Sequence, residues 1–250
     1  MHALTYNEVK PIGFLTNFIE SLWEYEALET DYVHTIIPDG CFDLIAEFEN
    51  GTLKAIKLTG VWINPIDVKI PKSTKILAIR FKLLAAEYLF QQELKSILNT
   101  AKDLPLTFWN IHLYQGQDLQ KFASEIFNRI ENLIKCSKAI DDKKRKLFEL
   151  VYKRQSLSVK ELSERVFWSS RQINRYFNQQ FGFPLKTFLN VIRCYTSYNE
   201  ISKGNLFPKA NYFDQAHFIK EIKKHTNATP GELFKNENVR FLQLATQSKK

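Results

Sequence analysis

The spacing of the apolar residues changes once along this chain, and that change constrains the fold more than any other feature of the sequence. Between residues 34 and 81, short apolar runs are separated by turn residues, a pattern typical of antiparallel strands. After Leu83 the apolar residues recur every three to four positions, which is typical of amphipathic helices. The order predicts an α+β protein with a small antiparallel β-barrel or sheet first and a helical region after it.

Turn residues divide the first half into strands. Pro38-Asp39-Gly40 supplies one turn, because Pro fixes a backbone dihedral and Gly tolerates a positive φ. Asn50-Gly51 is the pair that a tight hairpin with two positive φ angles prefers. The expected strands are residues 34–37, 42–48, 53–58, 68–70 and 76–81.

Alternation within the second strand indicates a half-buried sheet. Neighbouring side chains of a strand point to opposite faces, so the even-numbered apolar residues of 42–48 are expected on one face, with Asp43 and Glu47 on the other. Upstream, the apolar residues from Phe14 to Trp23 recur at roughly helical spacing, although Leu22 to Tyr25 could equally begin a strand.

The strongest helical stripe of the first half runs from Leu119 to Ile134. This helix either closes the N-terminal core or pairs two subunits. A polar run from Ser137 to Lys146 follows, where composition and charge shift together. We place a domain boundary there, with an N-terminal domain at 1–140 (β-rich to about residue 82, helical over 83–136) and a helical domain at 141–250.

The two predicted domains differ in charge. Residues 1–140 hold 14 Lys and Arg against 17 Asp and Glu, whereas residues 141–250 hold 21 against 10. A basic surplus confined to one segment favours a polyanionic partner, because Lys and Arg release condensed counterions from a phosphate backbone. Membranes and acidic proteins also attract cationic surfaces, so charge alone leaves those partners open.

Cysteine usage and the amino terminus point to an intracellular protein. Cys41, Cys136 and Cys194 lie far apart and form neither a CxxC pair nor a His/Cys cluster, so no zinc finger or disulfide framework is indicated. No targeting segment opens the chain, and no apolar run reaches the ~18 residues of a membrane span. We expect a cytoplasmic protein that is not bound to a membrane.

A pattern typical of a helix-turn-helix begins at Ser158. Ser158 and Glu161 have the spacing of a capping box, which satisfies free amides at a helix start. After a break at Phe167-Trp168, Ser169 or Ser170 can cap a second helix that runs to about Phe181 and ends at Gly182. In such a unit the second helix can enter the major groove of DNA.

The second helix of this unit has two different faces. Ile173, Phe177 and Phe181 recur every four residues and are expected to pack inward. Arg and Asn side chains lie on another side, and these groups match the hydrogen-bonding edges of guanine and adenine. An ordinary solvated polar face is the alternative.

Helix signals continue to the end of the chain. A linking helix is expected to begin near Pro184 and to separate two DNA-reading units. Asp214 can cap a further helix whose Phe218 and Ile222 point inward, and a capping box at Thr229-Pro-Gly-Glu232 begins a last short helix.

Residues 157–234 resemble the C-terminal domain of the arabinose-operon-regulator (AraC/XylS) family, which has two helix-turn-helix units joined by a long helix. The matching motifs are Ser169-x-Arg171-x-Ile173-x-Arg175-x-Phe177 ending at Gly182, Pro184 with Phe188-Leu189 and Arg193, and Asp214-Gln-Ala-His-Phe218 leading through Lys223-Lys224 to Thr229-Pro230. Several spacings must coincide over some 75 residues, which makes the resemblance specific.

The resemblance implies a set of DNA contacts. The implied base-reading residues are Arg171, Gln172, Asn174, Arg175, Asn178, Gln215, Ala216 and Lys220, and the implied phosphate contacts are Ser170, Lys186, Arg193 and Lys224. Arg193 has a second interpretation as a brace of the linking helix, and His217 is interpreted as a packing residue. The chain departs from the family between Gly204 and Phe213, where Pro208 leaves no room for a normal leading helix. The second unit is therefore expected to be shortened or docked differently.

The N-terminal half resembles the cupin-like sensor domain of such regulators through Phe18-Ile-Glu-Ser-Leu-Trp23 and Pro38-Asp-Gly-Cys-Phe-Asp43. Such a domain binds a small effector or pairs subunits. His34, Asp39, Cys41 and Asp43 could be imagined as a metal cluster, but each also has a structural explanation.

Together these features predict a sequence-specific transcription regulator, with double-stranded DNA as its partner, activation as one mode of action, no cofactor and no enzymatic activity. RNA polymerase, a small-molecule effector and a second copy of the chain remain open as further partners. One alternative is a cupin-like small-molecule or metal-binding enzyme with a nucleic-acid-binding tail. Another is a protein-interaction module whose helices bind a partner helix.

Overall fold

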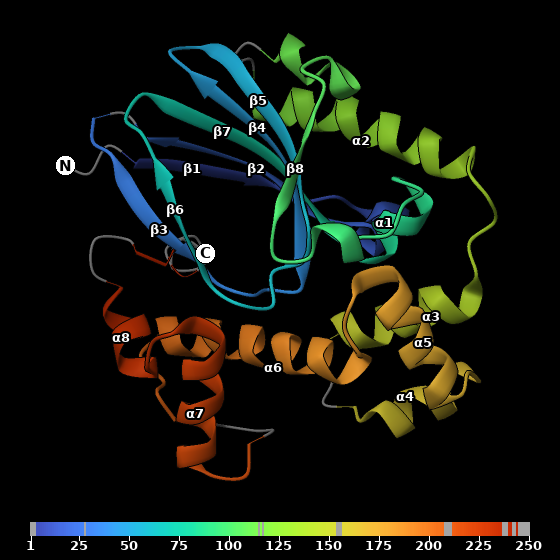
Figure 1. Ribbon diagram of the computed structural model, residues 1–250. Coiled ribbons are helices and arrows are strands. Elements are labelled where there is room, and N and C mark those ends of the chain that lie inside the picture. The colour runs from blue at the N-terminus through green and yellow to red at the C-terminus, as the bar shows by residue number, and fades with distance from the viewer. Residues whose placement is uncertain are drawn as a thin grey trace.

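In Figure 1 the β-sheets lie above, together with the helices that precede residue 136, and the helices of the second half of the chain lie below. The computed structural model describes residues 4–27, 29–114, 116, 118–153, 157–207, 212–236, 240–241 and 244. The predicted α+β class is confirmed, because the strands lie in the first half and the second half is helical. Among the described helices, none combines the length and the apolar character of a bilayer span.

The strands form two antiparallel sheets. The larger has the order β1-β2-β7-β4-β5-β8 and the smaller pairs β3 with β6. The strands are β1 (Leu4–Val9), β2 (Ile19–Ala27), β3 (Tyr32–Ile36), β4 (Cys41–Glu49), β5 (Thr52–Thr59), β6 (Ile66–Ile70), β7 (Thr74–Lys82) and β8 (Ala101–Leu104).

The expected hairpin is present. Asn50 and Gly51 have φ angles of 49° and 75°, and they join β4 to β5. These two positive φ angles are the ones that a tight hairpin turn needs, so the turn sets the register that pairs Phe48 with Leu53. All five expected strands are confirmed, with bounds that differ by a few residues.

The helical interpretation of residues 14–23 is wrong beyond Asn17. Only a short 3-10 helix, η1 (Gly13–Asn17), forms there, and β2 begins at Ile19. Pairing of β2 with both β1 and β7 gives a hydrogen-bonding partner on each side, and this long-range pairing outweighs the local helical spacing. The edge strands β1 and β8 were not predicted.

Helices form much of the described chain outside these strands. The 3-10 helices η2 and η3 and the α-helices have these bounds: α1 (Leu84–Tyr88), η2 (Lys95–Ile97), η3 (Phe108–Leu113), α2 (Leu119–Lys135), α3 (Asp142–Tyr152), α4 (Val159–Val166), α5 (Ser170–Phe181), α6 (Leu185–Ser202), α7 (Gln215–Thr226) and α8 (Pro230–Lys235).

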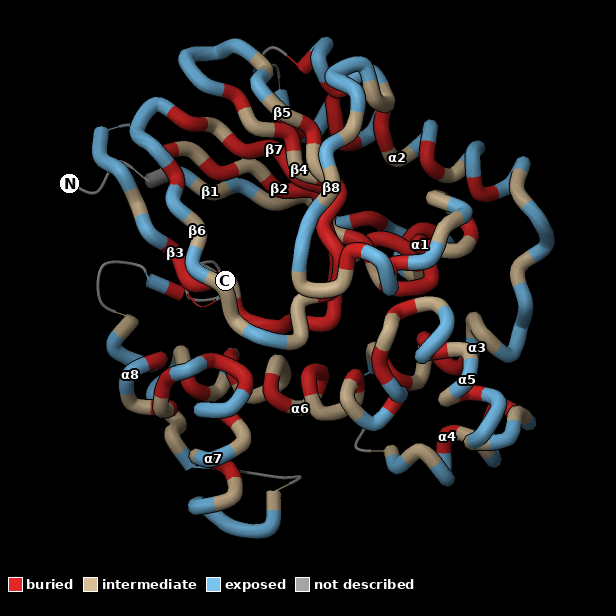
Figure 2. The backbone as a smooth tube through the Cα atoms, in the orientation of Figure 1, coloured by how far each residue is buried: buried red, intermediate tan, exposed pale blue. Residues whose placement is uncertain are grey.

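The main hydrophobic core lies between the larger sheet and the helices, and it continues into the helical layer (Figure 2). Helix α2 buries Phe122, Ile126 and Ile130 in it, so this helix closes the N-terminal core, one of the two roles expected for it. The same cluster includes Phe148 of α3 and Phe177 of α5. Hydrophobic packing thus crosses the boundary proposed at residue 141, and the division into two domains stays a prediction.

The turn before β4 connects the larger sheet to α3 and α6. The carbonyl oxygen of Gly40 accepts a hydrogen bond from the Tyr152 hydroxyl at 2.8 Å, and that of Pro38 accepts one from Tyr198 at 3.2 Å. Gly40 has a φ of 80°, and a Cβ there would lie 2.5 Å from Ile192 of α6. The turn predicted at residues 38–40 therefore also positions α3 and α6.

A second connection uses residues near the end of the chain. The Arg240 carbonyl accepts a hydrogen bond from the Thr35 amide at 2.6 Å, and Thr35 forms a parallel bridge with Phe241. Phe241 is buried with Tyr198 and Phe218 in a second hydrophobic cluster. The sheet of β3 and β6 is thus held against the last helices of the chain.

Candidate nucleic-acid interface

Helices α4 and α5 form a compact helix-turn-helix whose ends are fixed by local hydrogen bonds. Ser158 and Glu161 form the expected capping box at α4, and Ser169 forms a second one with Gln172 at α5. Between them Phe167 takes a φ of 52°, which turns the chain in a single left-handed step. Gly182 ends α5 with a φ of 85°, as expected.

The inward face of α5 is confirmed. Ile173, Phe177 and Phe181 are each 0% exposed. The Phe177 ring centroid lies 5.7 Å from that of Phe148 in α3 and 5.8 Å from that of Phe188 in α6. Aromatic packing against both neighbours fixes the rotation of α5 about its axis, so its opposite face is presented in a defined direction.

Arg171 and Arg175 lie on that opposite face, and both are exposed. Among the described residues, neither guanidinium has an ion pair or hydrogen bond within the protein. Figure 2 shows exposed positions along α4 and α5, away from the sheets. Two unpaired guanidinium groups one helical turn apart offer planar, bidentate donors to an external acceptor.

Unlike the two arginines, the Asn and Gln side chains of α5 named above form hydrogen bonds within the protein. The Asn174 Oδ1 atom accepts a hydrogen bond from the Leu185 amide at 3.1 Å, and its Nδ2 atom donates to the Ser170 carbonyl at 3.0 Å. Asn174 therefore joins α5 to the start of α6, which argues against base reading by this residue. Gln172 uses its Oε1 atom in the capping box, and exposed Asn178 donates to the Asn174 carbonyl at 2.8 Å.

Some of the candidate phosphate contacts are exposed, whereas others have contacts within the protein. Lys186 in the first turn of α6 and Lys224 near the end of α7 are exposed, while Ser170 is half-buried. The Arg193 Nη2 atom lies 3.4 Å from a Glu221 carboxylate oxygen, and its guanidinium lies 5.1 Å from the Tyr212 ring centroid. These contacts favour the bracing role of Arg193, because they join α6 to α7.

Helix α7 has the expected cap and faces. The Asp214 Oδ1 atom accepts a hydrogen bond from the His217 amide at 2.7 Å. Phe218 and Ile222 are buried, whereas the implied base readers are exposed. Those exposed residues are Gln215, Ala216 and Lys220.

The second unit departs from a regular helix-turn-helix. Residues 203–207 and 212–214, which are the described residues between α6 and α7, form no helix. Pro208, on which the prediction of a shortened unit rested, lies outside the described residues. The His217 Nδ1 atom accepts a hydrogen bond from the Phe213 amide at 3.3 Å, in keeping with a packing role.

Helix α6 sets the separation between the two units, since it contacts α5 near its start and α7 farther along. Its 18 residues correspond to a length of about 27 Å at 1.5 Å per residue. Successive major-groove faces lie about 34 Å apart. The contact with α7 lies near the middle of α6, at Arg193, so the separation of α5 and α7 is shorter than the full length of α6.

Phe213 was not singled out from the sequence. It precedes the cap of α7 and is 93% exposed. At this position an apolar residue usually packs on the first turn of the helix, but Tyr212 takes that place, with its ring centroid 4.9 Å from that of Phe218. The sequence signal for an exposed aromatic residue here was the pair Tyr212 and Phe213 before Asp214. The sequence does not distinguish the member that packs on α7 from the member that is exposed.

Three of the residues considered for a metal cluster have side-chain partners within the protein. The His34 Nε2 atom lies 2.7 Å from the Tyr25 hydroxyl, and Asp39 and Asp43 both contact Arg80. Within the part of the chain that the structure describes, no group of three His, Cys, Asp or Glu side chains is placed to hold a metal ion.

Comparisons with known proteins give one family model and one set of structures. Residues 7–103 match a family described as a domain of unknown function, DUF6597. No curated protein matches the chain.

The solved structures that match include three of ToxT from Vibrio cholerae. The P21 form at 1.65 Å resolution has 12% identity and a TM-score of 0.41, covering 92% of this chain and 98% of ToxT. An apo structure of a ToxT variant with a single lysine-to-alanine substitution has 14% identity and a TM-score of 0.40, covering 92% and 96%. The wild-type protein with a bound unsaturated fatty acid has 13% identity and a TM-score of 0.38, covering 93% and 94%.

Proposed function

We propose that this chain is a sequence-specific double-stranded DNA-binding transcription regulator of the AraC/XylS type, in which α5 reads bases in a major groove. One observation carries the proposal: α5 buries an apolar face completely and leaves Arg171 and Arg175 exposed on the other, with no ion pair or hydrogen bond to the residues that the structure describes. An ordinary solvated face would also be polar, but two unpaired guanidinium groups on a rigidly packed helix suit recognition of guanine edges.

The surroundings of α5 support the same proposal. Lys186 follows the end of α5 closely, at the exposed start of α6. The surplus of 21 Lys and Arg over 10 Asp and Glu in residues 141–250 favours association with a polyanion. The N-terminal domain would then regulate binding through an effector or through dimerisation, and RNA polymerase is a proposed partner of the bound complex.

Selection from random-sequence duplexes tests the proposal directly. The full chain is expected to enrich a defined motif, and an Arg contact predicts conserved G·C pairs within it. The enriched duplex should bind at least tenfold more tightly than a scrambled one at the same salt concentration, a small ratio for specific DNA recognition. Equal affinity for both duplexes would contradict sequence-specific binding.

Lys186→Ala is expected to weaken binding to every duplex alike, because an ammonium group that contacts phosphate carries no sequence information. The slope of log K against log salt should fall in magnitude by about one, the value for a single lost phosphate contact. Fluorescence anisotropy from low to moderate salt measures this slope.

Lys54→Ala serves as the control for Lys186→Ala. Lys54 lies on β5 with 55% of its side chain exposed, so the substitution removes an equal charge far from α5. Its slope should match that of the wild-type chain. A slope for Lys186→Ala that equals the wild-type value would remove Lys186 from the proposed interface.

A further inference from the structure

The C-terminal half of α5 is hydrogen-bonded to residues of the predicted N-terminal domain. The Leu94 amide donates a hydrogen bond to the Gln180 carbonyl at 2.7 Å, and the Gln180 Nε2 atom donates to the Gln92 carbonyl at 2.6 Å. Both partners belong to the segment after α1. The helix that carries Arg175 therefore does not pack only within its own helical layer.

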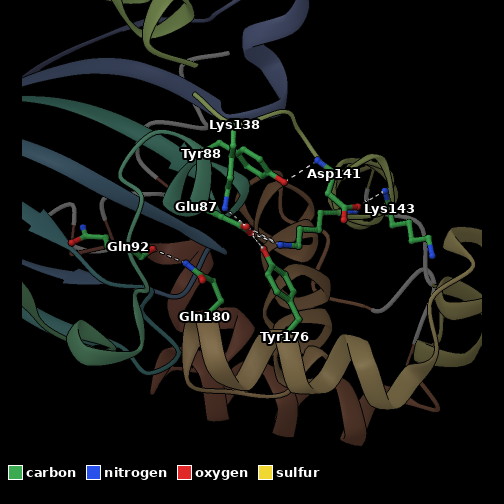
Figure 3. A network of polar contacts seen from close by, with 9 residues as sticks. Glu87, Tyr88, Gln92, Lys138, Asp141, Lys143, Tyr176 and Gln180 are labelled. Carbon is green, nitrogen blue, oxygen red and sulfur yellow. Dashed lines mark hydrogen bonds and ion pairs between the residues drawn. The ribbon is translucent and has the colours of Figure 1, made fainter. Parts of the chain in front are cut away.

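Glu87 of α1 forms the centre of this contact (Figure 3). One carboxylate oxygen accepts hydrogen bonds from Lys138 Nζ at 2.7 Å and Lys144 Nζ at 2.8 Å. The other accepts from Lys144 at 2.8 Å and from the Tyr176 hydroxyl of α5 at 3.1 Å. A single carboxylate thus joins α1, the segment before α3, α3 itself and α5.

The charges make this contact strong. Only 14% of the Glu87 side chain and 18% of the Lys144 side chain are exposed. Burial alone would raise the pKa of Glu87, but hydrogen bonds from Lys138 and Lys144 outweigh it and lower the pKa below its ordinary value. The pKa of Tyr176 is raised by burial and by Glu87, so its hydroxyl keeps the proton that it donates. Removal of the carboxylate would leave a half-buried ammonium group and a hydroxyl without an acceptor.

We propose that Glu87 is a positioning residue that couples the N-terminal domain to the recognition helix, fixing α5 in the orientation that presents Arg171 and Arg175. The proposal rests on the proposed function for the identity of what α5 reads. A displacement of the residues around Glu87 would also displace Tyr176, which directly follows Arg175 in α5. The orientation of the proposed DNA-binding face would change with it. Glu87 itself touches no DNA in this arrangement.

Glu87→Gln in the full chain tests the coupling. Amide hydrogen exchange in α5 should rise about tenfold, since loss of the ionic contacts lowers the free energy of local opening. Affinity for the enriched duplex should fall about five- to tenfold, because a loosened helix must be ordered again on binding. Exchange in the central strands β4 and β7 should stay unchanged, which separates local loosening from global unfolding.

Glu149→Gln is the matched control. Glu149 also has two cationic partners, Lys153 at 2.6 Å and Arg145 at 3.8 Å, but both belong to α3 or to its end. The substitution makes the same charge change without touching α5, so exchange in α5 and duplex affinity should remain within about twofold of wild type, as expected for an exposed ion pair.

Tyr176→Phe supplies a milder test that keeps the fold. The ring still packs against Trp168 and Phe148, and only the hydroxyl that reaches Glu87 is lost. Exchange in α5 should rise by a smaller factor than in Glu87→Gln. If amide hydrogen exchange in α5 is the same in Glu87→Gln and Tyr176→Phe as in the wild-type chain, the proposed coupling is wrong. If exchange rises but no duplex is bound by the wild-type chain, the coupling stands and the proposed function fails.

Discussion

Arg80→Met is expected to lower the free energy of unfolding by about 3 to 5 kcal/mol, the cost of removing one partner from a buried ion pair. Arg80 lies between two carboxylates, with its Nη2 atom 3.4 Å from Asp39 and its Nε atom 3.3 Å from Asp43. Between 9% and 16% of each of these side chains is exposed. Met fills the volume of the side chain but leaves both carboxylates without their cation.

The loss of stability in Arg80→Met should become smaller as the pH falls. Burial already raises the pKa of Asp43 above its ordinary value, although Arg80 opposes that shift. Without Arg80 the pKa rises further. A carboxyl whose pKa is raised in the folded state destabilises the fold above that pKa, and the penalty disappears as the pH falls through it. The difference in stability between Arg80→Met and wild type should therefore shrink on acidification, as urea unfolding at neutral and acidic pH would measure.

A neutral triple variant separates loss of charge pairing from loss of packing. Asp39→Asn and Asp43→Asn keep the Oδ1 acceptors that bind the Cys41 amide and the Trp23 indole. Combined with Arg80→Met, they should recover more than half of the lost stability, because no charge is then buried without a partner. If Arg80→Met alone lowers the free energy of unfolding by less than about 1 kcal/mol, the value typical of exposed pairs, the two carboxylates are solvated.

This cluster also explains how the sheet holds the helices. Asp39 belongs to the turn whose carbonyl groups accept hydrogen bonds from Tyr152 and Tyr198. Arg80 fixes that turn from β7, in the middle of the sheet. Loss of Arg80 should consequently loosen the docking of α3 and α6 before it unfolds the sheet, and hydrogen exchange in these helices would detect it.

The features predicted correctly from the sequence are those encoded within a few residues. Ser158 with Glu161 and Thr229 with Glu232 begin helices because each pair satisfies the amides of its own first turn. Asn50-Gly51 turns a hairpin because both residues accept positive φ. Such signals do not depend on the rest of the fold, and they were sufficient to place α4, α5, α7 and α8.

The features that escaped prediction are pairings between distant residues. Tyr176 and Glu87 are 89 positions apart, and the hydrogen bond of Tyr198 to Pro38 spans 160. No periodicity or motif marks either partner. Residues 22–25 were ambiguous between helix and strand for the same reason, because β2 forms only when β1 and β7 supply its partners. DNA contact by Asn174 stays a prediction, but the sequence did not indicate that its amide group also joins α5 to α6.

Arg175→Ala is expected to reduce affinity for the enriched duplex by about 1 to 3 kcal/mol, the range for loss of one bidentate base contact. The guanidinium is exposed and has no partner among the described residues, so the substitution leaves no buried group unsatisfied and should not change the unfolding midpoint. The preference at one base pair should relax at the same time. Competition with duplexes mutated at each position measures both effects.

Arg175→Lys distinguishes base reading from simple charge attraction. Lysine keeps the positive charge but lacks the planar fork that pairs with two acceptors of guanine. It should therefore retain affinity for scrambled duplexes while losing most of the preference for the enriched one. If Arg175→Lys binds like wild type and Arg175→Ala weakens all duplexes equally, Arg175 contacts phosphate, and base recognition by α5 would have to come from another side chain on the same face.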